Sequence, residues 1–259
     1  MRIWYQTSSS IGKAKRYDDY EATLKSYLSQ VARPGTEVSV HGVEHNSTLA
    51  QTFMYEELLH DHQIIENLLK AQQDGYDAFC VTCMYDPAFY ALREVADIPV
   101  LSLAEASMLS ACLLSPNFSI LCHHKPLLRR LIELVKRYGL QDRFIECDSF
   151  EIGTVKLFDS AFKNPEIILE PAREVAREAA RKGVCMFISG GGAINMILAK
   201  HNVHQIEGIP ILEGGGALLK MTEMLVDLKN IGIERTKLGL YTPIPKEDLT
   251  YMRKLYGLE

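Results

Sequence analysis

One structural order occurs twice along this chain, over residues 79–114 and again over residues 186–228. Each copy runs from an apolar, strand-like segment through a turn into a helix, then through an Ile-Pro strand and a glutamate-containing turn into a second helix. The first turn is Cys83-Met84-Tyr85, and the matching turn in the second copy is Gly190-Gly191-Gly192. Strands that alternate with helices predict an α/β fold with mainly parallel sheets. The repeat therefore predicts two related lobes that face each other across a cleft, with both turns in one site.

The same periodicities predict the remaining elements. Strands are predicted at residues 3–5, 37–43, 78–82, 98–103, 117–121, 144–147, 184–188 and 209–214. Helices are predicted at residues 17–31, over most of 45–71, from residue 86, and at 105–114, 126–138, 171–181 and 216–229. We assign residues 1–115, together with a C-terminal segment from about 215 to 259, to lobe 1, which carries Cys83. Residues 116–214 form lobe 2, which carries the glycine turn.

Composition and charge argue against several classes of protein. The 259 residues carry a formal net charge of -5, so the chain lacks the basic footprint of a nucleic-acid-binding protein. It has no run of about 18 apolar residues and no signal-peptide layout at its N-terminus, so we expect no membrane span. The six cysteines are scattered, and several lie in apolar runs, which is typical of reduced thiols. We therefore expect a cytoplasmic protein whose partner is a small molecule.

Cys83 stands where the strand predicted at residues 78–82 ends. Asp86-Pro87 follows it, with Asp86 as the predicted cap of a helix and proline at the first helical position. A thiol at the carboxyl end of a parallel strand lies where open α/β sheets carry their chemistry. A helix N-terminus nearby favours the thiolate. We therefore predict that Cys83 is catalytic and that Tyr85 and Asp86 belong to the substrate-binding site.

A polar loop of small residues follows the first strand. Its Ser8, Ser9 and Ser10 offer hydroxyls and backbone amides that suit a carboxylate or an amide carbonyl. A helix cap with surface serines explains the same residues equally well. We retain all three serines as predicted substrate-binding residues.

The glycine turn is the second candidate for holding a substrate. Gly190, Gly191 and Gly192 open a helix, where bare backbone amides suit a carboxylate or an oxyanion. The alternative is a tight turn that lets the helix pack closely. A nucleotide phosphate loop is disfavoured because the turn lacks a lysine.

Two histidines and a cysteine follow the strand predicted at residues 117–121. A histidine with an ordinary pKa of about 6.5 exchanges protons at neutral pH, so His123 and His124 are candidate acids or bases. Alternatively, His123 only binds the substrate and His124 caps the next helix. Cys122 is predicted to be either a buried spectator or part of the pocket wall, and we retain it as a substrate-binding candidate.

No metal site is predicted. His60 and His62 are two residues apart and do not share a helix face, so a solvated face or a subunit contact explains them better than a metal pair. Cys80 and Cys83 form a lone C-x-x-C motif, but in an extended strand their side chains point to opposite faces.

Several of these motifs resemble, in order, those of the aspartate/glutamate/hydantoin racemase superfamily, on its hydantoin racemase side. Cys83-Met84-Tyr85-Asp86-Pro87 resembles its first cysteine motif, in which two variable residues separate Cys from Asp-Pro. Further similar segments are residues 6–10, 98–100, 104–106, 209–214 and 239–243. The similarity covers nearly the whole chain. It implies two Rossmann-like lobes related by a pseudo-twofold axis, an active site between them, and a homo-oligomer, because family members commonly associate.

The resemblance also implies chemistry without a cofactor. The family's racemases use two cysteines, one per lobe, because inversion requires an acid and a base on opposite sides of one carbon. In this chain the second cysteine position aligns with Gly190 or with Ser189. Cys185 is predicted to lie inside a strand and to point into the core. The second thiol is therefore missing.

A single thiol leaves several functions open. The leading hypothesis is an isomerase that acts through Cys83 on a small carboxylate or a cyclic amide such as a hydantoin, with His123 or His124 in place of the missing thiol. Alternatively, Cys83 is a nucleophile, in a hydrolase of a small amide or imide or in a covalent cis-trans isomerase. The superfamily's decarboxylases protonate a carbanion with one thiol, but they keep the second cysteine and lack the first. A binding protein without catalysis is the last alternative.

Overall fold

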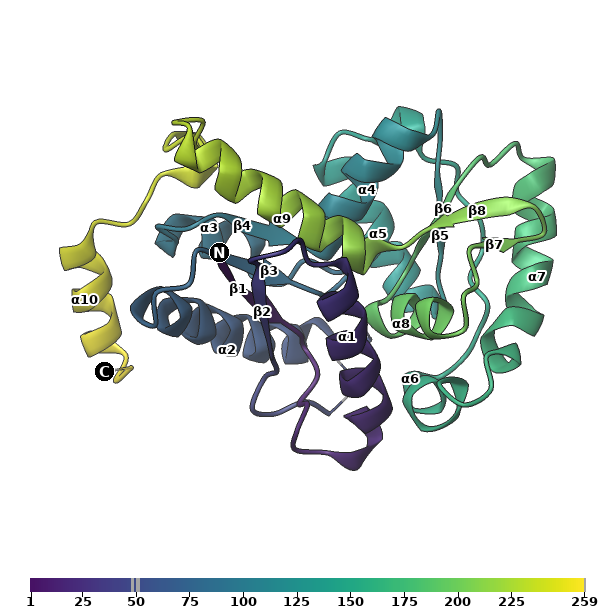
Figure 1. The fold of residues 1–259 in the computed structure, drawn as a ribbon, viewed down its shortest axis with the longest axis horizontal. Helices are drawn as coiled ribbons and strands as arrows, with labels where there is room; N and C mark the ends of the chain where they lie inside the picture. The colour runs from purple at the N-terminus through teal and green to yellow at the C-terminus, as the bar shows by residue number, and fades with distance from the viewer. Residues whose placement is uncertain (48, 50–51, 259) are drawn as a thin grey trace.

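The computed structural model describes residues 1–47, 49 and 52–258, and it contains two four-stranded sheets flanked by helices (Figure 1). The first sheet has the order β2-β1-β3-β4 and is parallel throughout. Its strands are β1 (Arg2–Gln6), β2 (Glu37–His41), β3 (Ala78–Val81) and β4 (Val100–Ser102). The second sheet has the order β5-β6-β8-β7, with only β7 antiparallel. Its strands are β5 (Ser119–Leu121), β6 (Phe187–Ser189), β7 (Gln205–Ile206) and β8 (Ile209–Leu212).

The two sheets repeat one arrangement, so the predicted α/β fold with two lobes is confirmed. The order β1-β3-β4 in the first sheet corresponds to β5-β6-β8 in the second. Strand β3 and strand β6 therefore hold the same internal place in their sheets. Because Cys83 follows β3 and Gly190 follows β6, the two turns lie at corresponding strand ends. The lobe boundaries at residues 115 and 214 stay a prediction.

Helices cover both sheets. Their bounds are α1 (Asp18–Val31), α2 (Met54–Gln73), α3 (Phe89–Val95), α4 (Leu103–Leu114), α5 (Lys125–Arg137), α6 (Thr154–Lys156), α7 (Glu166–Arg181), α8 (Gly192–Lys200), α9 (Gly214–Asn230) and α10 (Lys246–Leu255). Helix α9 follows the second sheet in the chain but packs on β3 and β4 of the first, so it returns the chain to lobe 1 (Figure 1). Within the described residues, no helix is both long enough and apolar enough to cross a membrane.

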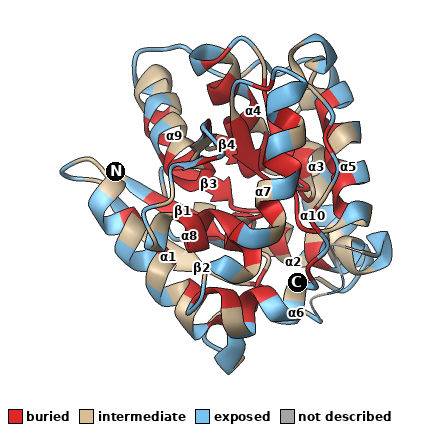
Figure 2. Cartoon of the chain, turned by 90° about the vertical axis from the view of Figure 1, so that its right-hand side faces the viewer, coloured by how far each residue is buried: buried red, intermediate tan, exposed pale blue. Residues whose placement is uncertain are grey.

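The core lies where the strands are covered by helices on both sides. All four residues of β3 are buried, as are all three of β6, and Figure 2 shows the buried strands between partly exposed helices. Short apolar strands without polar alternation are typical of parallel sheets covered on both faces. The strand ends, rather than the strands, are therefore the places where polar side chains can meet.

The segment at residues 144–147 is not a strand, contrary to prediction. A single parallel bridge joins Phe144 to Phe118, and the chain then leaves the sheet. Its continuation donates backbone hydrogen bonds from Phe150 to the carbonyl of Cys122 and from Ile152 to the carbonyl of His123. This segment therefore supports the end of β5 instead of extending the sheet. Cys185 is also exposed rather than in the core, because β6 begins only at Phe187.

Candidate active site

Cys83 and the glycine turn line one small cavity between the lobes. Its volume is about 30 Å³, which is room for about one water molecule. Of the predicted site residues, eight line it: Ser8, Ser9, Cys83, Tyr85, His123, Gly190, Gly191 and Gly192. The cavity therefore brings together the ends of β1, β3, β5 and β6, as expected where parallel strands end at one edge.

The Cys83 thiol is enclosed. Its residue is 6% exposed, and the Ser8 hydroxyl donates a hydrogen bond to its sulfur over 3.4 Å. Burial raises the pKa of Cys83 to about 11, although hydrogen bonds from Ser8 and Tyr85 oppose the shift. Cys83 is therefore a protonated thiol at neutral pH in this enclosed site, contrary to the predicted thiolate. Helix α3 begins only at Phe89, too far along the chain for its dipole to act on the sulfur.

The glycine turn is packed closely at its first residue and is open at its second. A Cβ atom on Gly190 would lie 2.9 Å from the Cα atom of Cys122, which is shorter than real contacts allow. A Cβ atom on Gly191 would make only ordinary van der Waals contacts, with the His123 ring at 3.7 Å and with Cδ1 of Ile194 at 3.9 Å. Close packing thus explains why residue 190 is glycine. The amides of Gly191 and Gly192 lie at the start of α8, where N–H groups have no hydrogen-bond partner within the helix.

His123 faces the glycine turn from the end of β5. It is 1% exposed, and burial, together with the neighbouring His124, lowers its pKa to about 3. In the closed cavity His123 is therefore a neutral imidazole at physiological pH. A neutral imidazole can donate one hydrogen bond and accept another.

Four predicted substrate-binding residues lie outside the cavity lining: Ser10, Asp86, Cys122 and His124. Ser10 is buried in the loop after β1. The Cys122 thiol is buried and donates to the carbonyl oxygen of His124. The His124 ring lies 3.0 Å from the Thr52 hydroxyl.

Asp86 caps a helix, but not the one predicted. Its backbone is left-handed (φ 46°), and so is that of Ala88, which delays the start of α3 to Phe89. Its carboxylate accepts instead from the amides of Ala104 and Glu105, at 2.9 and 3.1 Å, and so caps α4. The hydroxyl of Tyr138 also donates to it. Asp86 therefore fixes the Cys83 turn to α4 and to lobe 2.

Polar contacts join the lobes close to the cavity. Tyr138 of α5 binds Asp86, and His124 binds Thr52. Glu57 of α2 and Arg130 of α5 also form an ion pair, and both side chains are largely buried. Each of these contacts connects a residue of lobe 1 with a residue of lobe 2.

His60 is the main polar residue near the site that sequence reasoning missed. The prediction of a solvated or subunit-facing histidine is wrong, because His60 is 1% exposed and contacts Tyr85. Its spacing with Ile64, Leu68 and Ala71 could have revealed this, since all four lie on one buried stripe of α2. Tyr20, Thr82 and Phe158 also line the cavity without having been predicted.

Within the described parts of the chain, no group of three or more His, Cys, Asp or Glu side chains could hold a metal ion. Cys80 and Cys83 have separate surroundings, because the Cys80 sulfur faces the carbonyl of Trp4 and the Cys83 sulfur faces Ser8. The lining instead offers a thiol, an imidazole, hydroxyls and backbone amides. Such groups transfer protons and stabilise oxyanions.

Comparison with known proteins gives concordant matches. The family model for Asp/Glu/Hydantoin racemase matches residues 18–222. A hydantoin racemase from Pseudomonas sp. (strain NS671) is 31% identical over 203 residues, covering 78% of each chain. The structure is similar to allantoin racemase from Klebsiella pneumoniae, with a TM-score of 0.76, 24% identity and 95% of each chain covered. It is also similar to allantoin racemase from Pseudomonas fluorescens, with a TM-score of 0.79, 20% identity and coverage of 95% and 98%.

Proposed function

Because this chain belongs to the Asp/Glu/Hydantoin racemase family, we propose that it is an isomerase that moves a proton at a carbon beside the carbonyl of a small cyclic amide. The 31% identity to a hydantoin racemase favours a 5-substituted hydantoin as substrate. In a hydantoin this carbon lies between a carbonyl and a ring nitrogen, so loss of its proton gives a planar enolate. Return of the proton to the other face inverts the centre. The reaction consists of proton transfers alone, and we therefore propose that no cofactor takes part.

The observation that supports this proposal is that Cys83, which is 6% exposed, lines one small cavity together with His123 and the glycine turn. Cys83 transfers the proton on one face of the substrate. The Gly191 and Gly192 amides, at the positive end of α8, hold the carbonyl oxygen that becomes negative in the enolate.

His123 is the second proton carrier in this proposal. No thiol fits at residue 190, because a side chain there would collide with Cys122, whereas the His123 ring already reaches the open position beside Gly191. The cavity of about 30 Å³ is smaller than a hydantoin, so the cleft opens to admit substrate. Opening exposes His123 to water and removes the main cause of its lowered pKa. Its pKa then moves back toward about 6.5, where imidazole exchanges protons readily.

The test is hydrogen exchange on single enantiomers of 5-substituted hydantoins and of allantoin in D₂O, followed by NMR and circular dichroism against a protein-free blank. We expect deuterium at C5 together with loss of optical activity. Cys83→Ser lowers both rates by about 10²- to 10⁴-fold, the usual contribution of one proton-transferring group. His123→Asn slows inversion more than exchange, because one face keeps its proton carrier.

Other outcomes contradict the proposal in different ways. Ring opening supports the hydrolase alternative, although the relatives reported above are all named as racemases. Binding without exchange supports a binding protein, and full activity in Cys83→Ser removes the thiol from the mechanism.

Two further properties belong to this proposal. We propose a cytoplasmic location, which is supported by six cysteines that are all free thiols. We also propose a homo-oligomer, supported by exposed apolar side chains at the start of α2: Phe53, Met54, Tyr55 and Leu58. Light scattering on the purified protein tests the second point, and a monomeric mass contradicts it.

A further inference from the structure

An aromatic ring of lobe 2 lines the cavity but has no part in the proposed proton transfers. Phe158 is 7% exposed and borders the cavity together with Cys83. It lies in a π-helical turn, Leu157–Ala161, between α6 and α7. Turns of this kind are rare in proteins and often occur at functional sites. The ring is therefore a candidate for a role in substrate recognition.

The ring of Phe158 packs against two tyrosine rings of lobe 1. Its centroid lies 4.9 Å from that of Tyr17 and 5.7 Å from that of Tyr20, and the ring planes cross at 83° and 81°. Edge-to-face packing of this kind is favourable for aromatic pairs. Both tyrosines are almost fully buried, and Tyr20, in α1, also lines the cavity. The three rings therefore meet where the two lobes come together.

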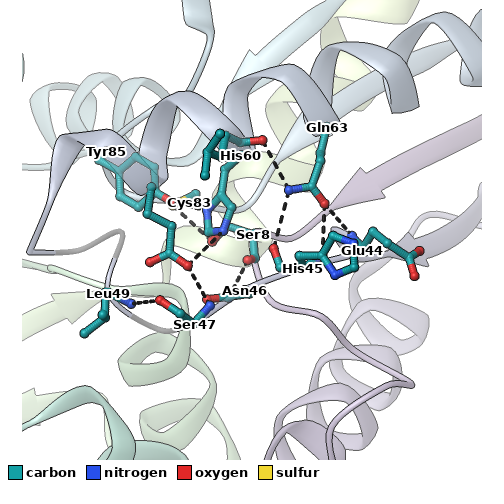
Figure 3. A network of polar contacts seen from close by, with 12 residues as sticks. Ser8, Glu44, His45, Asn46, Ser47, Leu49, His60, Gln63, Cys83 and Tyr85 are labelled. Carbon is teal, nitrogen blue, oxygen red and sulfur yellow. Dashed lines mark hydrogen bonds and ion pairs between the residues drawn. The ribbon is translucent and has the colours of Figure 1, made fainter. Parts of the chain in front are cut away.

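A polar network lies beside Cys83, below helix α2 (Figure 3). The Ser8 hydroxyl donates to the Cys83 sulfur, and the Asn46 side chain donates to the Ser8 carbonyl. Gln63 of α2 accepts from the amide of His45 and fixes this segment to the helix. An apolar substituent of a substrate placed there would cost hydrogen bonds, whereas beside Phe158 it would contact aromatic carbon atoms.

We propose that Phe158 is a specificity-determining residue that sets how large a substituent the site admits at C5 of its substrate. A hydantoin ring carries two carbonyl and two N–H groups, which suit the hydroxyls and backbone amides of the lining. The C5 substituent is the part that varies, and an apolar one needs apolar lining. The inference rests on the proposed function, because it takes the substrate to be a 5-substituted hydantoin.

Other apolar side chains of the lining are less able to give way to a substituent. Leu127 and Ile194 are at most 1% exposed and lie in the first turns of α5 and α8. Displacing either of them would disturb a helix that packs in the core. Phe158 belongs instead to a short turn and is partly exposed. Because the cavity holds about 30 Å³, a larger substituent takes its space from this ring.

Phe162 provides a matched control. It directly follows the same turn, is 1% exposed, and stacks on the Phe158 ring with 6.4 Å between the centroids. Its ring also packs against Tyr20, at 6.1 Å. Among the described residues, however, it is not one that lines the cavity. Loss of either ring weakens the same aromatic cluster, but only loss of the Phe158 ring enlarges the cavity directly.

The first test measures alkylation of Cys83 by iodoacetamide and by the bulkier N-benzyl iodoacetamide, in the full-length protein without substrate. Peptide mass spectrometry follows Cys83, and the exposed Cys185 reports the reactivity of each reagent. The ratio of the two rates cancels any general loosening of the cleft, which speeds both reagents.

We expect Phe158→Ala to raise the ratio of the bulky to the small reagent at Cys83 by about tenfold, a usual discrimination of a pocket against added apolar bulk. Phe162→Ala leaves this ratio close to the wild-type value. An unchanged ratio in Phe158→Ala, or an equal rise in both variants, overturns the proposal. If Phe158→Ala does not fold, Phe158→Leu is measured instead, and an unchanged ratio there also overturns it.

The second test compares kcat/KM for C5 exchange of 5-methylhydantoin and 5-benzylhydantoin. We expect Phe158→Ala to raise the preference for the benzyl compound by about tenfold, and Phe162→Ala to leave it unchanged. If the wild type exchanges hydantoins and Phe158→Ala keeps the wild-type preference, the proposed function stands and the role of Phe158 is refuted. If the wild type exchanges neither compound, the proposed function fails, and the alkylation ratio still decides whether Phe158 limits the size of the site.

Discussion

The contrast between Gly190 and Gly191 gives the most direct test of how this site is built. A methyl group at residue 190 would lie 2.9 Å from Cα and 3.0 Å from Cβ of Cys122, and 3.1 Å from the carbonyl oxygen of Leu121. The first and third of these are backbone atoms, and the Gly190 amide is hydrogen-bonded to that same Leu121 oxygen at 2.9 Å. The clash can be relieved only by separating the ends of β5 and β6.

The cost follows from these contacts. Overpacking of this kind costs about 1–3 kcal/mol, and losing the hydrogen bond adds about 0.5–1.5 kcal/mol. We therefore expect Gly190→Ala to lower the free energy of unfolding by about 2–4 kcal/mol, and the melting temperature by roughly 5–15 °C for a chain of this size. Gly191→Ala meets only ordinary contacts on extended backbone (φ -172°), so it changes stability by less than about 1 kcal/mol.

The assay is thermal and urea unfolding of both variants beside the wild type. Equal stability of Gly190→Ala and Gly191→Ala would refute the reasoning, because the two variants differ by one methyl position in one turn. The same geometry predicts that Gly190→Cys destabilises the protein without restoring a second thiol. Gly191→Cys is accommodated and places a thiol beside His123.

Three further outcomes follow from the structure. Burial raises the pKa of Asp86 from 3.8 to about 7, so the folded state holds one more proton than the unfolded state between these pH values. The free energy of unfolding of the wild type therefore falls as pH rises through this range, by at most about 1.4 kcal/mol per pH unit. Melting curves at pH 4.5 and 7.5 should show a smaller change in Asp86→Asn than in the wild type. Glu213 accepts from the amides of Gly215 and Gly216 at the start of α9, so Glu213→Ala should lose about 0.5–2 kcal/mol in urea unfolding, and an unchanged midpoint and slope contradict this. Arg130→Met removes the ion pair with Glu57 that joins the lobes, so iodoacetamide should label Cys83 about fivefold faster. This corresponds to a free energy of cleft opening that is lower by about 1 kcal/mol. An equal or slower labelling rate argues against a role of this ion pair in holding the lobes together.

Local pattern was sufficient to predict the strand ends. Cys83 and Gly190 were assigned to corresponding turns because short apolar runs flanked by turn residues predict buried strands wherever they pack. The resemblance to the racemase superfamily, confirmed by the family match over residues 18–222, rests on the same short motifs. The segment at residues 144–147 shows the limit, because it lies beside the free edge of β5 but makes only one bridge there, between Phe144 and Phe118, before the chain leaves the sheet.

Partners distant in sequence could not be predicted in this way. Asp86 was recognised as a cap, but its helix begins 17 residues further along, because left-handed backbone at Asp86 and Ala88 turns the carboxylate toward α4. The spacing of His60 in its helix could have indicated burial, but nothing in that helix indicates its partner Tyr85, 25 residues away, so it was assigned to a solvated face or a subunit contact.

The sequence by itself determined an α/β chain with a repeated strand-turn-helix unit, one thiol at the first turn and none at the second. Only the tertiary structure decided that Gly190 has no room for a side chain, that His123 lies at the open position beside it, and that the buried His60 contacts Tyr85 and Glu56. The physical reason is that periodicity records which face of a segment is buried. The distances between strand ends and helices, which set steric room and pKa, arise only when the two lobes pack together.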